Sequence, residues 1–177
     1  MIRRLALLVT VAALVGATAG CGSGGSSSAL SKDEYQVKVV AAGTDLAQQF
    51  GNISKEADTL SNHGVKSSGD ATKLFKDLGL VVAKGEAELR AFADDLGSLT
   101  PPDDAKDAND ELVRGFGQLA DDFGELGAAL EDGSISDITQ LGGRMEAIGT
   151  SDAGRTIQGA ITELEEAGYD FGPSRSS

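Results

Sequence analysis

Residues 71–99 read ATKLFKDLGLVVAKGEAELRAFADDLGSL, and this stretch decides the fold class. Its apolar and small residues recur on one face about every 3.5 positions. The stripe they form is Ala71, Leu74, Leu78, Val81, Gly85, Leu89, Phe92, Leu96 and Leu99. This period is typical of a helix that packs along a seam with other helices. We expect Asp70 to cap the start of this helix and Gly97-Ser98 to end it.

The segment before it predicts another helix of the same kind. Ser31 is followed three residues later by Glu34, which is the spacing of a capping box. Leu30 and Tyr35 flank this pair at the positions of a hydrophobic staple. The apolar stripe that follows is Tyr35, Val39, Ala42, Leu46, Phe50, Ile53, Ala57 and Leu60. We expect Asn62-His63-Gly64 to end this helix.

Two further helical stripes follow. Thr100-Pro101-Pro102-Asp103 predicts a helix start with Thr100 as the cap, because proline is tolerated in a first turn. The third stripe runs from Ala105 to Leu130 and is expected to end at Gly133. A fourth begins near Ser134, is interrupted at residues 149–152, and resumes as far as Gly168.

Short connections between four amphipathic segments favour antiparallel neighbours. The sequence therefore predicts an all-α fold, an up-down-up-down four-helix bundle whose last helix is kinked or broken near Gly149. The bundle domain is expected over residues 31–171, with a frayed tail at 172–177. In this topology the first helix begins where the last one ends. Tyr35 should therefore lie near Tyr169 or Phe171.

Glycine is unusually frequent in these helices. The chain has 24 glycines among 177 residues, and each one inside a helix costs about 1 kcal/mol relative to alanine. Either close helix contact or hinge motion would explain them. The helical glycines are Gly43, Gly51, Gly85, Gly115, Gly117, Gly124, Gly127, Gly154 and Gly159.

The first twenty residues have the pattern of a secretory signal peptide. A short start with Arg3 and Arg4 precedes an uncharged run at residues 5–15, and small residues follow at 16–20. An apolar run this short does not span a bilayer core, which needs about 20 residues. We therefore expect residues 1–20 to be removed on export by the general secretory route.

The only cysteine, Cys21, stands directly after these small residues. Thr18-Ala19-Gly20-Cys21 resembles the lipobox of bacterial lipoproteins, with Thr18 where that signal usually has leucine. The resemblance implies cleavage before Cys21, a diacylglyceryl thioether on its sulfur, and palmitate-type acylation of the new amino terminus. It also implies an extracytoplasmic protein, lipid-anchored at the cell membrane. The alternative is an ordinary secreted protein with a stray cysteine.

The residues after Cys21 predict a flexible tether over 21–30, because GSGGSSS at 22–28 has no apolar content. A lipid with two chains suits stable anchoring, since one acyl chain alone binds a membrane only marginally. The net charge of the whole chain is −13. This acidity argues against sequence-independent binding to nucleic acid.

Searches for chemistry in the sequence find no catalytic residue, no cofactor motif and no metal site. One cysteine and one histidine, His63, exclude a disulfide within the chain and a two-histidine metal centre. The acidic run at 107–111 begins like a calcium loop, but Leu112 and Gln118 stand where that loop needs glycine and glutamate. The phenylalanine stripe is expected to form core. We interpret the paired acids as solvated helix faces.

These observations favour a non-enzymatic binding or interaction protein of the bacterial cell envelope. The pattern loosely resembles small helical-bundle extracytoplasmic lipoproteins of unknown function. A small-ligand carrier with an apolar pocket between helices is the main alternative, and an envelope hydrolase is a weaker one. Basic residues collect at the end of the bundle away from the tether, where an acidic partner could contact them: His63, Lys66, Lys73 and Lys76.

Overall fold

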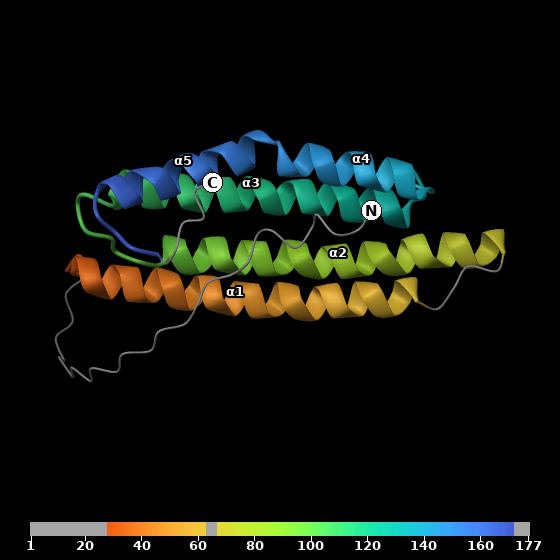
Figure 1. Ribbon diagram of the computed structural model, residues 1–177, viewed down its shortest axis with the longest axis horizontal. Coiled ribbons are helices and arrows are strands. Elements are labelled where there is room, and N and C mark those ends of the chain that lie inside the picture. Colours follow the sequence, from red (N-terminus) through yellow and green to blue (C-terminus); the bar gives the residue numbers. More distant parts are fainter. Residues whose placement is uncertain (1–27, 63–66, 172–177) are drawn as a thin grey trace.

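The computed structural model describes residues 28–62 and 67–171, and every regular element in these ranges is a helix (Figure 1). The helices are α1 (Lys32–Ser61), α2 (Ser68–Gly97), α3 (Lys106–Glu131), α4 (Ile138–Gly149) and α5 (Asp152–Glu166). The predicted signal peptide, Cys21, most of the tether, His63, Lys66 and the tail at 172–177 lie outside the described residues.

The helices form an up-down-up-down four-helix bundle, as predicted from the sequence (Figure 1). α1, α2 and α3 are the first three arms, and α4 and α5 together form the fourth. The predicted break is confirmed, because α4 ends at Gly149 and α5 begins at Asp152. At the end of α4 the hydroxyl of Thr150 donates a hydrogen bond to the carbonyl of Glu146. Ser151 caps the start of α5, because its hydroxyl accepts the amide of Gly154.

Each of the four arms packs mainly on the arm next to it in sequence. α1 lies against α2, α2 against α3, and α3 against α5. Within the described ranges, no Cα atom of α1 comes within 8 Å of a Cα atom of α3, α4 or α5. Side chains make the contact between α1 and α3 instead. The ring of Phe50 on α1 meets the ring of Phe123 on α3 edge to face, with centroids 6.0 Å apart.

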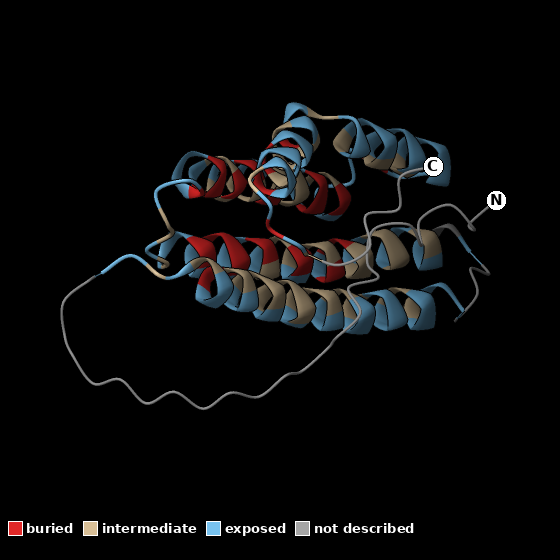
Figure 2. Cartoon of the chain, turned by 60° about the vertical axis from the view of Figure 1, so that its left-hand side comes forward, coloured by how far each residue is buried: buried red, intermediate tan, exposed pale blue. Residues whose placement is uncertain are grey.

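Two apolar cores divide the bundle, and Figure 2 shows buried residues on the facing sides of the helices. The Tyr35 core joins the start of α1 to the end of α5, and its buried members include Tyr35, Leu96, Leu112, Leu164 and Tyr169. The Leu130 core lies under α4 and is built on Leu126, Leu130 and Ile135. We call the corresponding ends of the molecule the Tyr35 end and the Leu130 end.

The start of α1 and the glycine helix ends were predicted correctly, whereas other helix starts were not. The Ser31–Glu34 capping box is present, and Leu30 packs on the Tyr35 core. Gly133 and Gly168 both have φ of +83°, the left-handed conformation expected of a glycine that ends a helix. The prediction for Asp70 is wrong: α2 is capped by Ser67, whose hydroxyl accepts the amide of Asp70.

The predicted start of the third helix is also wrong. Thr100 does not cap it; α3 begins at Lys106 after Ala105, which has no side-chain cap. A turn intervenes, since the amide of Ala105 donates to the carbonyl of Pro102 at 3.0 Å. The carbonyl of Thr100 instead accepts the amide of Leu30 at 2.8 Å, which fastens the chain before α1 to the α2–α3 connection.

The fourth helical arm starts later than predicted from Ser134. Asp137 is the cap, and it accepts the amides of Thr139 and Gln140. Ile135 belongs to the preceding loop, where it is 4% exposed in the Leu130 core and donates its amide to the carbonyl of Ala129. Ile135 is thus an apolar loop residue that packs on the core. In the sequence it has the spacing of the first residue of the helical stripe, which is why the predicted start was too early.

Ser31→Ala is expected to lower the free energy of unfolding by about 0.5–2 kcal/mol, because it removes the hydroxyl that accepts the amide of Glu34 in the capping box. Thr100→Ala is the matched control. It should change the free energy of unfolding by no more than about 0.5 kcal/mol, because its side chain is exposed and caps nothing. Urea denaturation of both variants measures the difference. Equal losses would show that the helix starts are assigned incorrectly.

The helical glycines differ in what surrounds them. At Gly79, Gly85, Gly115, Gly124 and Gly127, an added Cβ would meet a neighbouring helix. The tightest backbone approach is at Gly79, where the Cβ would lie 3.0 Å from the carbonyl oxygen of Gly127. At a second set nothing would be met within 4 Å: Gly43, Gly51, Gly117, Gly142, Gly143, Gly149 and Gly159. At Gly69, Gly97 and Gly154 the added Cβ would make only ordinary contacts of 3.7–3.9 Å. Close contact therefore explains only the first set.

Gly79→Ala and Gly43→Ala are expected to change stability in opposite directions. The new methyl group at position 79 meets the backbone of α3, which should lower the free energy of unfolding by about 1–3 kcal/mol. At position 43 the methyl group meets nothing, so the better helix propensity of alanine should add about 0.5–1 kcal/mol. Urea denaturation midpoints test this pair. Stabilisation by both variants would mean that α2 and α3 are not in backbone contact at Gly79.

Candidate functional site

The start of α1 and the end of α5 meet in a polar and aromatic cluster. The rings of Tyr35 and Tyr169 pack edge to face with centroids 5.6 Å apart, as predicted from the topology. The Tyr35 hydroxyl donates to Oδ1 of Asn109 at 2.9 Å. Asn109 donates from Nδ2 to the carbonyl of Leu96 at 3.3 Å. Burial raises the pKa of Tyr35 to about 12.

Tyr169 is also buried, and it links this cluster to the exposed Asp104. Its hydroxyl donates to Asp104 at 2.8 Å, and the amino group of Lys32 lies 4.5 Å above its ring. Lys32 also donates to the carbonyl of Ala167. Loss of solvent, followed by the hydrogen bond to the Asp104 carboxylate, raises the pKa of Tyr169. We call Lys32, Tyr35, Asp104, Asn109 and Tyr169 the clasp.

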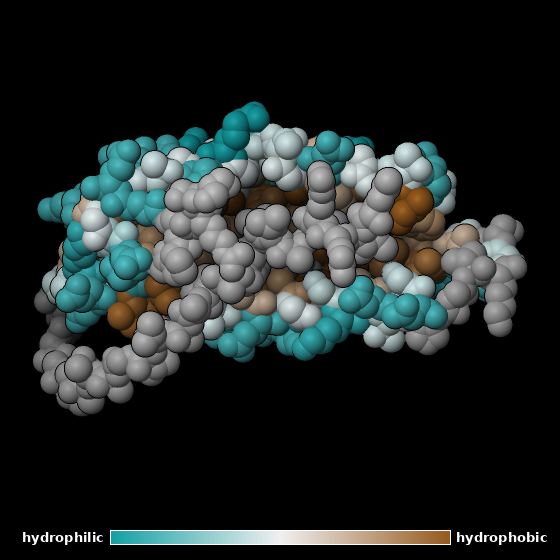
Figure 3. Space-filling view, viewed as in Figure 1, coloured by the Kyte–Doolittle hydropathy of each residue, from teal (hydrophilic) through white to brown (hydrophobic). Residues whose placement is uncertain are grey.

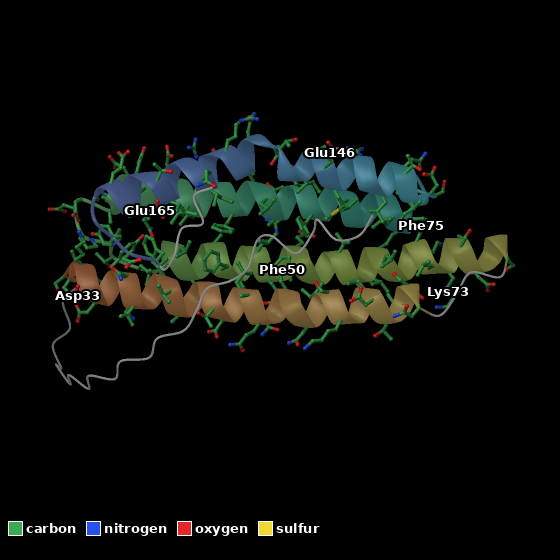
Figure 4. All side chains as sticks on the ribbon, in the orientation of Figure 1. Asp33, Phe50, Lys73, Phe75, Glu146 and Glu165 are labelled. Carbon is green, nitrogen blue, oxygen red and sulfur yellow. The ribbon has the colours of Figure 1, made fainter. Side chains whose placement is uncertain are left out.

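The clasp fixes the place where the chain leaves the bundle toward Cys21. Leu30 is bonded to the α2–α3 connection and packs on the Tyr35 core. The predicted lipid site, Cys21, lies nine residues earlier, outside the described residues. The chain therefore departs from the Tyr35 end, where Figure 4 labels Asp33 and Glu165. Sequence reasoning placed the tyrosines together but missed Lys32 and Asn109, which give no periodic pattern.

The opposite end holds the basic residues that were singled out as a contact surface. Lys73 lies there on α2, as Figure 4 shows, and pairs with Asp77 one turn later at 2.5 Å. Lys76 is exposed on the same helix. His63 and Lys66 lie outside the described residues. The pairing of Lys73 leaves less free positive charge at the Leu130 end than the sequence suggested.

A shallow pocket of about 120 Å³ lies where α3, α4 and the break before α5 meet. Two acids of α3, Asp122 and Glu125, line it opposite Arg144 of α4. Apolar lining comes from Leu126, Ala147 and Ile148, and Ser151 completes it. No phenylalanine is among these residues, so this is not the phenylalanine-lined pocket that a carrier would need.

The phenylalanines in the described ranges pack against one another or on the cores. Phe92 and Phe116 meet edge to face with centroids 4.6 Å apart, and Phe50 meets Phe123 in the same way. Phe75 packs on the Leu130 core. The interpretation of the phenylalanine stripe as core material is confirmed for Phe75, Phe92 and Phe116. Phe50 and Phe123 are half-buried and pack on each other outside the two cores.

The carboxylates are spread over the surface, much of which is hydrophilic on the face drawn in Figure 3. Within residues 28–62 and 67–171, no group of three or more His, Cys, Asp or Glu side chains is arranged to hold a metal ion. The acidic run at 107–111 lies in the first turns of α3, a regular helix rather than a calcium loop. No helix found in those ranges combines the length and apolarity that crossing a bilayer requires.

Comparison with known proteins adds no assignment. No protein-family model matches the chain, and searches of curated proteins and of solved structures find no match either.

Proposed function

We propose that the protein is a lipid-anchored, non-enzymatic binding or interaction protein of the bacterial cell envelope. The observation that carries this proposal is the sequence position of Cys21, the only cysteine, directly after a signal-peptide pattern. Lipid on that residue would hold the protein on the extracytoplasmic side of the cell membrane. No cofactor is invoked.

The geometry of the bundle supports this proposal. The chain toward Cys21 leaves from the Tyr35 end, so a lipid there would keep that end near the bilayer. α3 has 26 residues, and at 1.5 Å per residue it is about 39 Å long. The Leu130 end would then stand about 40 Å farther from the membrane and be the end most open to partners.

The two alternative functions have less support. A carrier of apolar ligands would need an enclosed apolar pocket, whereas the pocket beside α4 is small, open and partly lined by charged groups. A hydrolase of wall polymer would need paired carboxylates in a cleft. Asp122 and Glu125 do line a pocket, but α4 and Arg144 occupy its other side. Protein contact at the Leu130 end is therefore the function that we favour.

Site-specific photo-crosslinking in intact cells tests the proposal. A crosslinking residue at the exposed position Lys76 should give a discrete adduct with a partner. The same residue at Val37, which is 67% exposed near the Tyr35 end, is the matched control and should give none with that partner. Equal adducts from both positions, or none from Lys76, would contradict a partner at the Leu130 end.

A further inference from the structure

α4 is the most loosely packed helix of the bundle. It has no buried residue along its 12 positions, whereas the 15 residues of α5 include Ala153, Ala160 and Leu164 as buried positions (Figure 2). α4 also approaches α3 over a much shorter stretch than α5 does. Only Leu141, Met145 and Ile148 hold it on the Leu130 core. Few buried apolar contacts mean a low free energy for local opening.

The hydrogen bonds of α4 are satisfied without the rest of the bundle. Asp137 caps its first amides, and the side chain of Gln140 accepts the amide of Ser136 at 3.0 Å. At the other end Thr150 and Arg155 provide the side-chain bonds. Among the described residues, no hydrogen bond or ion pair joins α4 to α1, α2 or α3. Lifting α4 from the core therefore breaks apolar contacts only.

The glycines of α4 have no packing role. An added Cβ at Gly142, Gly143 or Gly149 would meet nothing within 4 Å. Gly142 and Gly143 lie in the middle of the helix, and Gly149 stands at its break with α5. These glycines lower the helix propensity of α4 and of its junction with α5. They do not let α4 pack closer to α3.

The surface under α4 is an apolar floor with an acidic edge. Leu126 and Leu130 of α3 form the floor. Phe75, Leu78 and Val82 of α2 pack on the same core. Asp122 and Glu125 border it on α3, and α4 offers them one basic residue, Arg144, which forms no ion pair with either. An occupant with more positive charge than α4 would match this edge better.

We propose that α4 is a displaceable cover and that the groove beneath it binds an amphipathic helix of a partner protein, with basic residues beside its apolar stripe. The proposal rests on the interaction function proposed above and names the partner's chemistry. α4 itself shows what the groove accepts: apolar side chains at positions i, i+4 and i+7, supplied by Leu141, Met145 and Ile148. The partner helix competes with α4 for these contacts.

Hydrogen exchange of the wild-type full chain tests whether α4 opens. The amides of 138–149 should exchange at least about tenfold faster than those of 152–166, because α4 opens without global unfolding. Gly142→Ala should slow exchange in α4, whereas the matched control Gly159→Ala, equally free of neighbours, should leave α4 unchanged. Equal protection of α4 and α5 in the wild type would overturn the proposal.

Peptide binding tests the groove. The probe is a fluorescent copy of residues 137–151 carrying Gly142→Ala, Gly143→Ala and Glu146→Lys. It should bind the full chain and bind Met145→Ala about tenfold more tightly, since weaker docking of α4 raises the open fraction. The double variant Asp122→Asn, Glu125→Gln should bind the probe about threefold more weakly, as expected for exposed charge pairs.

The control for this experiment is Ile161→Ala, which removes a half-buried side chain of α5 from the Tyr35 core. It should leave probe affinity unchanged. If the probe does not bind Met145→Ala, or if Ile161→Ala raises the probe affinity equally, the proposed binding groove is wrong. These measurements use purified protein and do not depend on a lipid at Cys21. Their failure is therefore distinguishable from failure of membrane anchoring.

Discussion

Cys21→Ala is expected to abolish membrane anchoring of the mature protein. The substitution removes the only thiol in the chain and with it the proposed attachment of two acyl chains. One or no acyl chain gives at most marginal, reversible binding to a bilayer. Cell fractionation should therefore find mature-sized protein only in the soluble fraction, or find unprocessed precursor instead. Labelling with a palmitate analogue should mark the wild type and leave the variant unmarked.

Ser23→Ala is the matched control for this experiment. It changes a tether residue next to the proposed lipid site and should leave both processing and membrane fractionation unchanged. A mature-sized Cys21→Ala protein that remains in the membrane fraction would show that the lipobox resemblance is misleading. The ordinary secreted protein would then be the better description of the chain.

The two tyrosines are expected to ionise together and cooperatively, at a higher pH than tyrosines of an unfolded chain. The chain contains only Tyr35 and Tyr169 and has no tryptophan, so tyrosinate absorbance near 295 nm reports on the clasp alone. The pKa of Tyr35 is raised to about 12 in the folded protein, against about 10 in an unfolded chain. The neutral phenol is thus favoured by folding. Its stabilising contribution is complete below pH 10 and is lost as the pH rises through about 12.

A shift of this size corresponds to about 3 kcal/mol for Tyr35, and the raised pKa of Tyr169 adds to it. We therefore expect helicity to be lost in the same pH range in which tyrosinate appears. Tyr35→Phe should lower the absorbance change by half and leave Asn109 without its hydroxyl donor. The denatured chain should titrate near pH 10. Titration near pH 10 with helicity intact would contradict the buried clasp.

The fold class was predictable because every arm of the bundle repeats its apolar residues with a helical period. The stripe from Tyr35 to Leu60 lies in the single helix α1, and the stripe from Ala71 to Leu96 lies in the single helix α2. The break near Gly149 was predictable as well, since residues 149–152 interrupt the register of the fourth stripe. Periodicity of this kind depends only on which side of a helix faces the core.

Helix starts were harder to predict, because several residues near a boundary can act as a cap. Ser67 and Asp70 are both good cap residues; Ser67 has the extended backbone of the cap, and Asp70 already lies in the first turn of α2. Thr100 is not the predicted cap of α3, because a turn that includes Pro102 follows it and α3 begins only at Lys106. Such choices follow from how the chain crosses the end of the bundle, which periodicity does not encode.

The candidate sites were predictable only in part. Tyr35 and Tyr169 were placed together by topology, whereas Asn109 and Lys32 emerged only from the packing of three segments far apart in sequence. The loose docking of α4 was hidden as well, because its stripe of Leu141, Met145 and Ile148 looks like that of a well-packed helix. How many residues of other helices pack on an apolar stripe depends on the tertiary structure and cannot be read from the stripe itself.

Packing between sequence neighbours also has a kinetic consequence. Contacts such as those of α1 with α2 and of α2 with α3 close short loops, which costs little chain entropy and favours rapid folding. The clasp is the exception, since Lys32 and Tyr35 meet Tyr169 from the other end of the chain, and the bond from Lys32 to Ala167 spans 135 positions. We therefore expect helical hairpins to form early and the contact that joins the two ends of the chain to form last.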